Sequence, residues 1–276
     1  MKIKLLAFDL DGTTLVNHRE LSPGNRQALL AAAEQGVMLV PATGRMLNFL
    51  PQTILELPIQ YAITCNGGAV YDVKSGQAVI RNLIDNQTAQ KIQRVLGEYD
   101  IYIEYYANGS AITQRDMPAM AKTHFALPEN KWGFVDGKDY ALVDDLEKML
   151  LETGLCPEKV NLPFLPPPVR EELWERLGKL EGLRLTSSIS DNMEINSRQA
   201  HKGGALLELA RRLGLRREEL MAIGDNGNDV TMLEAAGCSA AVADGSPQAL
   251  AAAGYVSCAH DQDGAAQAIR RFILDK

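Results

Sequence analysis

Two aspartates directly after an apolar run are the first residues of this sequence whose spacing suggests chemistry. Residues 9–13 read DLDGT, and residues 3–8 form a near-continuous apolar run, typical of a strand buried on both faces of a parallel sheet. On an extended segment Asp9 and Asp11, two positions apart, point to the same side. Carboxylates that close repel each other unless they bind a cation or share a proton. With its glycine turn, the pair indicates a site for a hard metal ion such as Mg²⁺.

Two other interpretations of this pentapeptide compete with the Mg²⁺ site. A calcium-binding loop needs an oxygen ligand at Thr13, then a glycine and, further on, a glutamate. Here the glycine comes too early, at Gly12, which argues against that loop. An Asx turn that caps a helix at the end of a strand is the second alternative for the pentapeptide taken alone.

A second acidic segment follows the strand predicted over residues 220–223. Residues 224–229 read GDNGND and bring Asp225, Asn228 and Asp229 to the end of that strand. Alone, the segment is equally compatible with a polar turn and a helix N-cap, a position that asparagine and aspartate favour. Together with the first acidic pair on another strand end, it favours a metal site.

Two further segments carry groups that suit a phosphate. Thr43, Gly44 and Arg45 follow the strand predicted over residues 37–41 and provide a hydroxyl, close backbone approach and a guanidinium. Lys202 stands at a predicted helix start, where the macrodipole disfavours a cation. A bound anion shared with the helix N–H groups explains a lysine there, while a plain turn and an exposed lysine are the alternatives.

Strands and helices alternate in both end regions of the chain. Strands are predicted over residues 3–8, 37–41, 61–65, 220–223, 240–242 and 255–257, and a hairpin over residues 69–73 and 78–82. Helices are predicted over residues 25–35, 49–57, 201–213, 229–236, 246–252 and 264–274. This order predicts a doubly wound α/β domain with a parallel sheet. Ligands bind beyond the carboxyl ends of such strands, where the sequence places Asp9, Thr43, Asn66 and Asp225.

The middle of the chain has a mixed α+β order. Helices are predicted over residues 88–99, 144–153 and 169–180, and strands over residues 101–106, 110–114, 183–189 and 193–196. A chain of 276 residues is also near the size at which single cores stop growing, which favours two domains. We therefore predict a core of residues 1–83 and 190–276, interrupted by an inserted domain over residues 84–189.

Composition narrows the classes of function. The net charge of −7, from 28 basic and 35 acidic residues, argues against binding to nucleic acid or anionic membranes. No apolar run approaches the roughly 18 residues of a membrane span. The four cysteines are scattered without a CxxC pair, as expected for buried free thiols in a reducing cytosol. We expect a soluble cytoplasmic protein.

Taken together, the four polar segments resemble the motifs of the haloacid dehalogenase-like hydrolases, specifically the Cof-type (class IIB) phosphatases. Residues 9–13 resemble motif one, Thr43 motif two, Lys202 motif three and residues 224–229 motif four. The insertion over residues 84–189 resembles the cap domain of this class, which sets substrate specificity. Two departures are small: Thr14 stands where an apolar residue is common, and His201 where a small polar residue is common.

The resemblance implies a mechanism and a role for each site residue. Asp9 is expected to be the nucleophile that forms an aspartyl-phosphate, and Asp11 the general acid and base. Mg²⁺ is expected to bind Asp9, the backbone carbonyl of Asp11 and Asp225, with Asp229 in support. Phosphoryl oxygens are expected to contact Thr43, Lys202, Asn228 and the backbone N–H groups near Leu10 and Gly44. Arg45 and Asn66 are expected to face the substrate.

Three functions agree with this sequence: a phosphatase, a phosphomutase of related build, and a phosphate-binding sensor without activity. All motif residues are present, which favours an enzyme, and the predicted substrate is a small phosphorylated metabolite such as a sugar phosphate or phosphorylated cofactor. Aromatic residues of the insertion are candidates for substrate contact or for core: Tyr102, Tyr105, Tyr106, Phe125 and Trp132. The sequence predicts neither the individual substrate nor whether the protein is a monomer or a homodimer.

Overall fold

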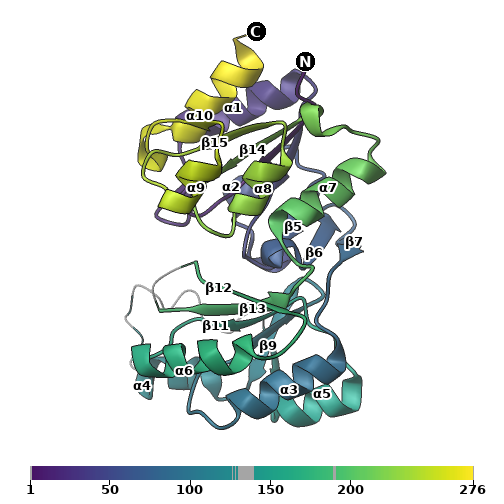
Figure 1. Ribbon diagram of the computed structural model, residues 1–276, viewed down its shortest axis with the longest axis vertical. Coiled ribbons are helices and arrows are strands. Elements are labelled where there is room, and N and C mark those ends of the chain that lie inside the picture. The colour runs from purple at the N-terminus through teal and green to yellow at the C-terminus, as the bar shows by residue number, and fades with distance from the viewer. Residues whose placement is uncertain (1, 126, 128, 130–139, 189–190, 276) are drawn as a thin grey trace. The chain divides into compact units, whose positions relative to one another are not determined.

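The computed structural model describes residues 2–275, apart from residues 126, 128, 130–139, 189 and 190. The chain divides into two compact units. Unit 1 consists of Met1–Arg81 and Ala200–Lys276, and unit 2 of Asn82–Gln199. Both ends of the chain, purple and yellow in Figure 1, therefore belong to unit 1.

A parallel five-stranded sheet forms the centre of unit 1. Its order is β16-β15-β14-β1-β4, with bounds Tyr255–Val256, Cys238–Ala241, Leu220–Gly224, Leu5–Phe8 and Met38–Pro41. The fully buried β1 lies in the middle and pairs in parallel with β14 on one side and β4 on the other. Beyond β4, β5 (Tyr61–Thr64) is reached through isolated parallel bridges such as Ala42 to Ile63. It begins an antiparallel sheet with β6 (Ala69–Asp72) and β7 (Gln77–Arg81).

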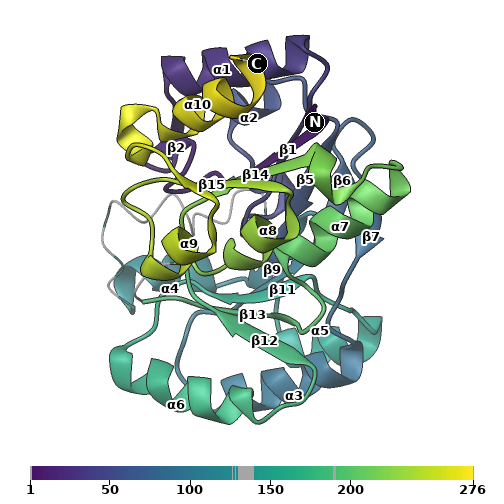
Figure 2. The ribbon, with the colours of Figure 1, turned by 45° about the horizontal axis from the view of Figure 1, so that its top comes forward.

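Helices cover both faces of this sheet, because successive residues of β1 point to opposite sides. Leu6 and Phe8 pack with α1 (Pro23–Glu34) and α10 (Gly264–Ile269), which lie side by side in Figures 1 and 2. Leu5 and Ala7 pack in the cluster of the opposite face. That face is covered by α7 (Lys202–Arg212), α8 (Val230–Ala235) and α9 (Pro247–Ala252). The predicted doubly wound α/β core is confirmed.

The remaining helical segments of unit 1 are short. The region predicted as one helix over residues 49–57 contains a 3₁₀ turn, Leu47–Phe49, and α2, Gln52–Leu55. The closing helix α10 continues into a π-helical turn, Arg270–Leu274. At the start of α1, the Ser22 hydroxyl accepts a hydrogen bond from the Asn25 N–H at 3.1 Å. Ser22 is therefore the predicted N-cap, with a proline in the first turn.

Unit 2 is built on a six-stranded, mainly antiparallel sheet. Its order is β10-β9-β8-β11-β13-β12, with bounds Ala141–Val143, Ser110–Gln114, Glu104–Ala107, Lys159–Leu162, Met193–Ser197 and Leu183–Thr186. Its apolar face carries Tyr105, Val160 and Ile195 and packs on helices α3 (Asn86–Leu96), α5 (Leu146–Thr153) and α6 (Pro167–Gly178). A further helix, α4, spans Met117–Thr123. The predicted α+β character of the insertion is confirmed.

The second boundary of the insertion differs from the predicted one. β13 pairs with β11 and β12, so the strand predicted over residues 193–196 belongs to unit 2. The boundary therefore lies after Gln199 and not after residue 189. The sequence prediction also missed α4, β10 and β11. In β11 the cause is its sequence, KVNL, whose polar residues obscure an otherwise buried strand.

Several individual predictions can be compared with their positions. Among the cap aromatics, Tyr102, Tyr105 and Tyr106 are buried and Phe125 is partly buried, whereas Trp132 lies outside the described residues. The four cysteines are free thiols, but of these Cys65 is buried and the other three are only partly buried. Among the helices of the described part, none is both long and apolar enough to cross a membrane.

Candidate active site

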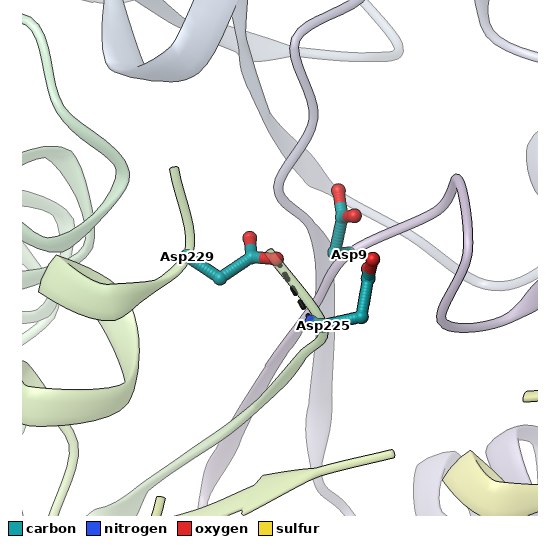
Figure 3. A group of neighbouring side chains, drawn as sticks. All are labelled: Asp9, Asp225 and Asp229. Carbon is teal, nitrogen blue, oxygen red and sulfur yellow. Dashed lines mark hydrogen bonds between the residues drawn. The ribbon is translucent and has the colours of Figure 1, made fainter. Parts of the chain in front are cut away.

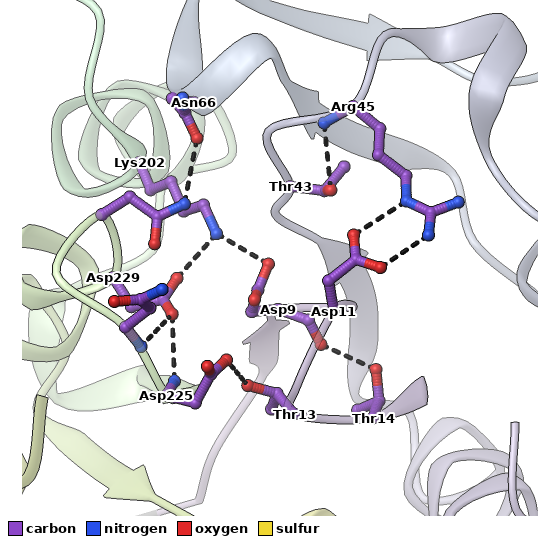
Figure 4. A network of polar contacts seen from close by, with 12 residues as sticks. Asp9, Asp11, Thr13, Thr14, Thr43, Arg45, Asn66, Lys202, Asp225 and Asp229 are labelled. Atoms are coloured by element: carbon purple, nitrogen blue, oxygen red, sulfur yellow. Dashed lines mark hydrogen bonds and ion pairs between the residues drawn. The ribbon is translucent and has the colours of Figure 1, made fainter. Parts of the chain in front are cut away.

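Four loops at the carboxyl edge of the unit 1 sheet hold the predicted residues. Asp9 follows β1, Thr43 follows β4, Asn66 follows β5 and Asp225 follows β14. Figure 4 shows these side chains together with Lys202. The sheet edge therefore brings segments together that are more than two hundred residues apart in the sequence.

Asp9, Asp225 and Asp229 form a compact acidic group (Figure 3). Each offers a carboxylate oxygen, and these oxygens lie within 4.8 Å of one another. Burial raises the pKa of Asp225 to about 6, and the charge of Asp229 adds to this effect. Burial and the neighbouring Asp229 also raise the pKa of Asp9 well above its usual value. This is the behaviour of like charges that are removed from water without enough counter-charge.

Lys202 supplies part of that counter-charge. Its Nζ lies 2.7 Å from Oδ1 of Asp9 and 2.7 Å from Oδ1 of Asp229, and its side chain is fully buried. Burial by itself lowers the pKa of Lys202, but the charges of Asp229 and Asp9 outweigh it and keep the lysine protonated. One ammonium facing three carboxylates leaves an excess of buried negative charge.

The start of α7 explains how Lys202 reaches this position. His201 is the N-cap, and its Nδ1 accepts a hydrogen bond from the Gly204 N–H at 2.9 Å. A Cβ on Gly203 would lie 2.0 Å from the Thr231 carbonyl oxygen, so a glycine is needed where α7 approaches α8. His201, the departure from the family pattern noted in the sequence, therefore has a capping role.

The loop after β14 is organised by Asp229. Its Oδ2 accepts hydrogen bonds from the backbone N–H groups of Asp225 and Asn226, both at 3.0 Å. A Cβ on Gly224 would lie 2.6 Å from the Asp229 side chain, so the strand must end in glycine. With its other oxygen on Lys202, Asp229 has both carboxylate oxygens engaged by protein groups.

The loop after β1 is held by two threonines. The Thr13 hydroxyl donates a hydrogen bond to Oδ1 of Asp225 at 2.5 Å, and the Thr14 hydroxyl donates to the backbone carbonyl of Asp9 at 2.7 Å. Both threonines are fully buried. Thr14, the second departure from the family pattern, thus ties the backbone of Asp9 to the following turn.

Asp11 points away from the acidic group, contrary to the prediction that its carboxylate pairs with that of Asp9. The chain turns at this point: Gly12 has a φ of +79°, and the N–H of Thr14 donates to the Leu10 carbonyl at 3.1 Å. The alternation of an extended strand therefore does not apply to Asp11, whose carboxylate faces Arg45 (Figure 4). Only the Asp11 backbone carbonyl remains a candidate metal ligand.

Arg45 and His18 surround the Asp11 carboxylate. Nε and Nη2 of Arg45 lie 2.8 and 2.6 Å from its two oxygens, and Nδ1 of His18 lies 2.9 Å from Oδ1. Burial by itself raises the pKa of Asp11, but hydrogen bonds from Arg45 and His18 hold it far below the usual value. In turn, the hydrogen bond with Asp11 raises the pKa of His18.

The contacts of Arg45 differ from its predicted orientation toward a substrate. Besides Asp11, its guanidinium donates to the backbone carbonyls of His18 at 2.6 Å and Phe49 at 3.3 Å. A carboxylate that accepts two parallel N–H groups is a strong partner for guanidinium, which accounts for this orientation. His18 was not singled out in the sequence. The sequence offered one indication of His18: it lies in a turn between two apolar segments, at a position where glycine is common.

The remaining polar side chains at this edge of the sheet are those of Thr43, Asn66 and Asn228. The buried Thr43 hydroxyl accepts a hydrogen bond from the Arg45 N–H at 3.1 Å. Asn66 is buried in a left-handed conformation, with φ +56°, and its Oδ1 lies 3.1 Å from Nδ2 of Asn228. Oδ1 of Asn228 is buried without a hydrogen-bond partner among the described residues. The predicted phosphate-binding side chains thus share one edge with the acidic group.

The residues present fit a magnesium ion. The acidic group offers oxygen donors, which Mg²⁺ prefers, and its excess negative charge is what a divalent cation neutralises. Asp229 accepts three hydrogen bonds from protein groups, whereas Asp9 and Asp225 each accept one from a protein side chain, so these two are better suited to direct coordination.

Comparisons with known proteins agree with this geometry. The family model of the haloacid dehalogenase-like hydrolases matches residues 6–269. Phosphatase YwpJ of Bacillus subtilis is 30% identical over 289 residues, which covers 98% of this chain and 100% of that protein. The 5-amino-6-(5-phospho-D-ribitylamino)uracil phosphatase YcsE of the same species is 28% identical, covering 99% of this chain and 96% of the relative.

Solved structures give the same result. The structure of a haloacid dehalogenase-like hydrolase from B. subtilis has a TM-score of 0.82 and 28% sequence identity, and the match covers 98% of this chain and all of that one, 100%. Both the core and the inserted unit are therefore shared. The chain belongs to the haloacid dehalogenase-like hydrolase family, within which it is a Cof-type phosphatase.

Proposed function

We propose that this phosphatase is Mg²⁺-dependent and hydrolyses a small phosphorylated metabolite through an aspartyl-phosphate on Asp9. The observation that carries the proposal is the surroundings of Asp9. Its buried carboxylate lies at the end of the central strand, 2.7 Å from the Lys202 ammonium and beside Asp225 and Asp229. An anionic nucleophile next to a fixed cation and an acidic group suited to a divalent metal is what phosphoryl transfer requires.

The proposed reaction has two steps. In the first, a carboxylate oxygen of Asp9 bonds to phosphorus while the bond to the leaving oxygen breaks. Asp11, whose pKa Arg45 and His18 hold far below its usual value in the free protein, takes up a proton from solvent and gives it to the leaving oxygen. In the second, water attacks phosphorus, Asp11 takes the proton, and phosphate leaves with the carboxylate of Asp9 restored. The dissociated metabolite alcohol and inorganic phosphate are the products.

Several groups are assigned to the charge on the phosphoryl oxygens. Lys202 supplies a fixed positive charge, and Thr43, Asn228 and the backbone N–H groups of Leu10 and Gly44 are the proposed hydrogen-bond donors. Asp9, Asp225 and the Asp11 carbonyl are the groups we assign to the metal, with Asp229 holding Lys202 and the loop. When bound, Mg²⁺ neutralises charge on the nucleophile and the transferred group, where positioning and electrostatics dominate catalysis.

The substrate class is proposed from the relatives and from unit 2. Relatives include phosphatases named for 5-amino-6-(5-phospho-D-ribitylamino)uracil and for HMP-PP. We assign substrate selection to unit 2, with a sugar phosphate or a phosphorylated cofactor as the substrate. This assignment gives a function to the second face of its sheet.

That second face of the unit 2 sheet is polar although it is buried. It carries Glu104, Tyr106, Lys159, Asn161 and Glu194, which alternate with the apolar residues that contact the helices. Lys159 and Glu194 form an ion pair at 2.7 Å, and Glu104 accepts hydrogen bonds from Asn161, Tyr106 and Tyr140. Such groups suit recognition of hydroxyl or amino groups on a metabolite.

Asp9→Asn tests the nucleophile. The amide cannot form the acyl-phosphate bond, so we expect phosphate release from p-nitrophenyl phosphate to fall by at least about 10³-fold. The variant should remain folded, since it removes one of several crowded buried charges. Melting temperature serves as the control, and substantial turnover by a folded variant contradicts the assignment. Isomerised hexose phosphate without phosphate release from the wild type would indicate a mutase instead.

Asp225→Asn tests the metal site. In the folded protein the pKa of Asp225 is raised to about 6. Between pH 4 and 6 the folded protein therefore binds more protons than the unfolded chain. Without metal, the free energy of unfolding should fall as the pH rises through this range. In EDTA at pH 7.5 we therefore expect the variant to be more stable, on the order of 1–3 kcal/mol. This advantage should shrink toward pH 4.

Magnesium should reverse the order of stability. Mg²⁺ is expected to raise the melting temperature of the wild type and to have little effect on Asp225→Asn. The exposed Asp144→Asn in unit 2 makes the same change of charge and should behave like the wild type. An equal response of Asp225→Asn and wild type to Mg²⁺ would show that Asp225 is no ligand.

Tyr106→Phe tests the polar face of unit 2. It deletes a hydroxyl that contacts Glu104 and Asn161 but keeps the ring. We expect KM for the preferred metabolite to rise about 2- to 10-fold, with kcat/KM for p-nitrophenyl phosphate unchanged. Tyr105→Phe is the matched control, because its hydroxyl contacts Gln93 and its ring packs in the opposite, apolar face. Equal effects of both variants on KM would contradict the assignment.

A further inference from the structure

The segment Cys65–Gly67, directly after β5, has an unusual backbone. Its three residues have φ values of +51°, +56° and +95° in succession. Residues with a side chain enter this left-handed region singly rather than in runs, because their Cβ then lies too close to a carbonyl oxygen. Cys65 and Asn66 are also buried. The disfavoured backbone therefore lies inside unit 1, at the same edge of the sheet as the candidate active site.

Neighbouring segments of the site hold this backbone in place. The N–H of Asn66 donates to the Thr43 carbonyl at 3.0 Å, and the preceding N–H donates to the Arg45 carbonyl at 2.9 Å. A Cβ on Gly67 would lie 2.5 Å from the His201 carbonyl oxygen, so the segment packs closely on the start of α7. A disfavoured conformation that is maintained by its surroundings at a site is typical of a functional constraint.

The side chain of Asn66 contacts that of Asn228. Oδ1 of Asn66 accepts a hydrogen bond from Nδ2 of Asn228 at 3.1 Å. Within the described part of the chain this is the one hydrogen bond of the Asn228 side chain, whose own Oδ1 is buried without a partner there. A buried oxygen without a partner is unfavourable. The contact with Asn66 is therefore what determines which end of the Asn228 amide faces which way.

The orientation of this amide decides what it can bind. An amide nitrogen carries two hydrogens, whereas the amide oxygen only accepts hydrogen bonds. Asn66 takes one hydrogen of Nδ2, and the second remains on the same nitrogen of Asn228. Phosphoryl oxygens are strong acceptors, so they need a donor. An amide rotated by half a turn would present an acceptor in place of that donor.

We propose that Asn66 is a positioning residue that orients the Asn228 amide as a donor to the transferred phosphoryl group. The proposal rests on the proposed function, in which Asn228 contacts a phosphoryl oxygen. Its consequence is that the Asn66 amide contributes to phosphoryl transfer only through Asn228. A general effect of Asn66 on the fold would instead lower activity whether or not Asn228 is present, and this difference separates the two roles.

Asn66→Gly is the decisive variant. It removes the amide, keeps the N–H that donates to Thr43, and places glycine in a backbone that glycine adopts readily. Its melting temperature should stay within about 3 °C of the wild type, because the relieved backbone offsets the greater freedom of the unfolded chain. Asn108→Gly is the matched control. It makes the same change at a φ of +53°, at an exposed position in the hairpin between β8 and β9 of unit 2.

The measurement is kcat/KM for p-nitrophenyl phosphate at saturating Mg²⁺. Loss of a hydrogen bond to a charged group should lower it by about 10- to 100-fold in Asn228→Ala. Asn66→Gly should lower it by at least about fivefold, and the double variant should match Asn228→Ala within about twofold, because the two residues act as a unit. Asn108→Gly should keep the activity of the wild type.

Three results would overturn the proposal. Losses that multiply in the double variant would show that Asn66 acts independently of Asn228. Full activity of Asn66→Gly would show that its amide is dispensable, and full activity of Asn228→Ala would show that there is no donor to orient. A failure of the proposed function is distinguishable, because then the wild type itself releases no phosphate or the folded Asp9→Asn variant keeps its activity.

Discussion

The structure of the site depends on one interaction, the buried contact of Lys202 with Asp9 and Asp229. Three carboxylates lie close together, and a single buried ammonium contacts two of them, Asp9 and Asp229. Partial compensation of this kind is costly for a folded protein, because one counter-charge does not neutralise three acids. The raised pKa values of Asp9 and Asp225 express that cost. The same excess charge makes the group suitable for a divalent cation.

Much of the surrounding backbone serves to bring these charges together. Glycines at positions 203 and 224 allow α7 to approach α8 and β14 to end against Asp229. His201 caps α7 and places Lys202 in its first turn, and Thr13 joins the loop after β1 to Asp225. None of these residues needs to touch a substrate. The side chains of His201 and Thr13, and the absence of a Cβ at the two glycines, determine how closely three separate segments approach at one edge of the sheet.

Asp9 and Asp11 show how two identical side chains, two positions apart, acquire opposite environments. Asp9 lies among acids and one lysine, and its pKa is raised mainly by burial. Asp11 lies beyond a turn at Gly12, between Arg45 and His18, and its pKa is lowered by them. Titratable groups whose environments separate their pKa values are candidates for separate chemical roles. In the proposed mechanism Asp9 bonds to phosphorus and Asp11 acts as general acid and base. The turn at Gly12 separates the two environments.

The sequence by itself determined the doubly wound core, the inserted α+β unit and the edge on which the polar motifs meet. Hydrophobic alternation and strand ends are local patterns, and the carboxyl ends of parallel strands share one edge. The tertiary structure decided the partners of each side chain. It turned Asp11 toward Arg45, assigned β13 to unit 2, and brought His18 to the carboxylate of Asp11. These outcomes depend on a positive φ at Gly12, on strand pairing and on a turn that places histidine where glycine is usual. Such contacts join segments that are distant in sequence or separated by a turn, so no local pattern of residues could predict them.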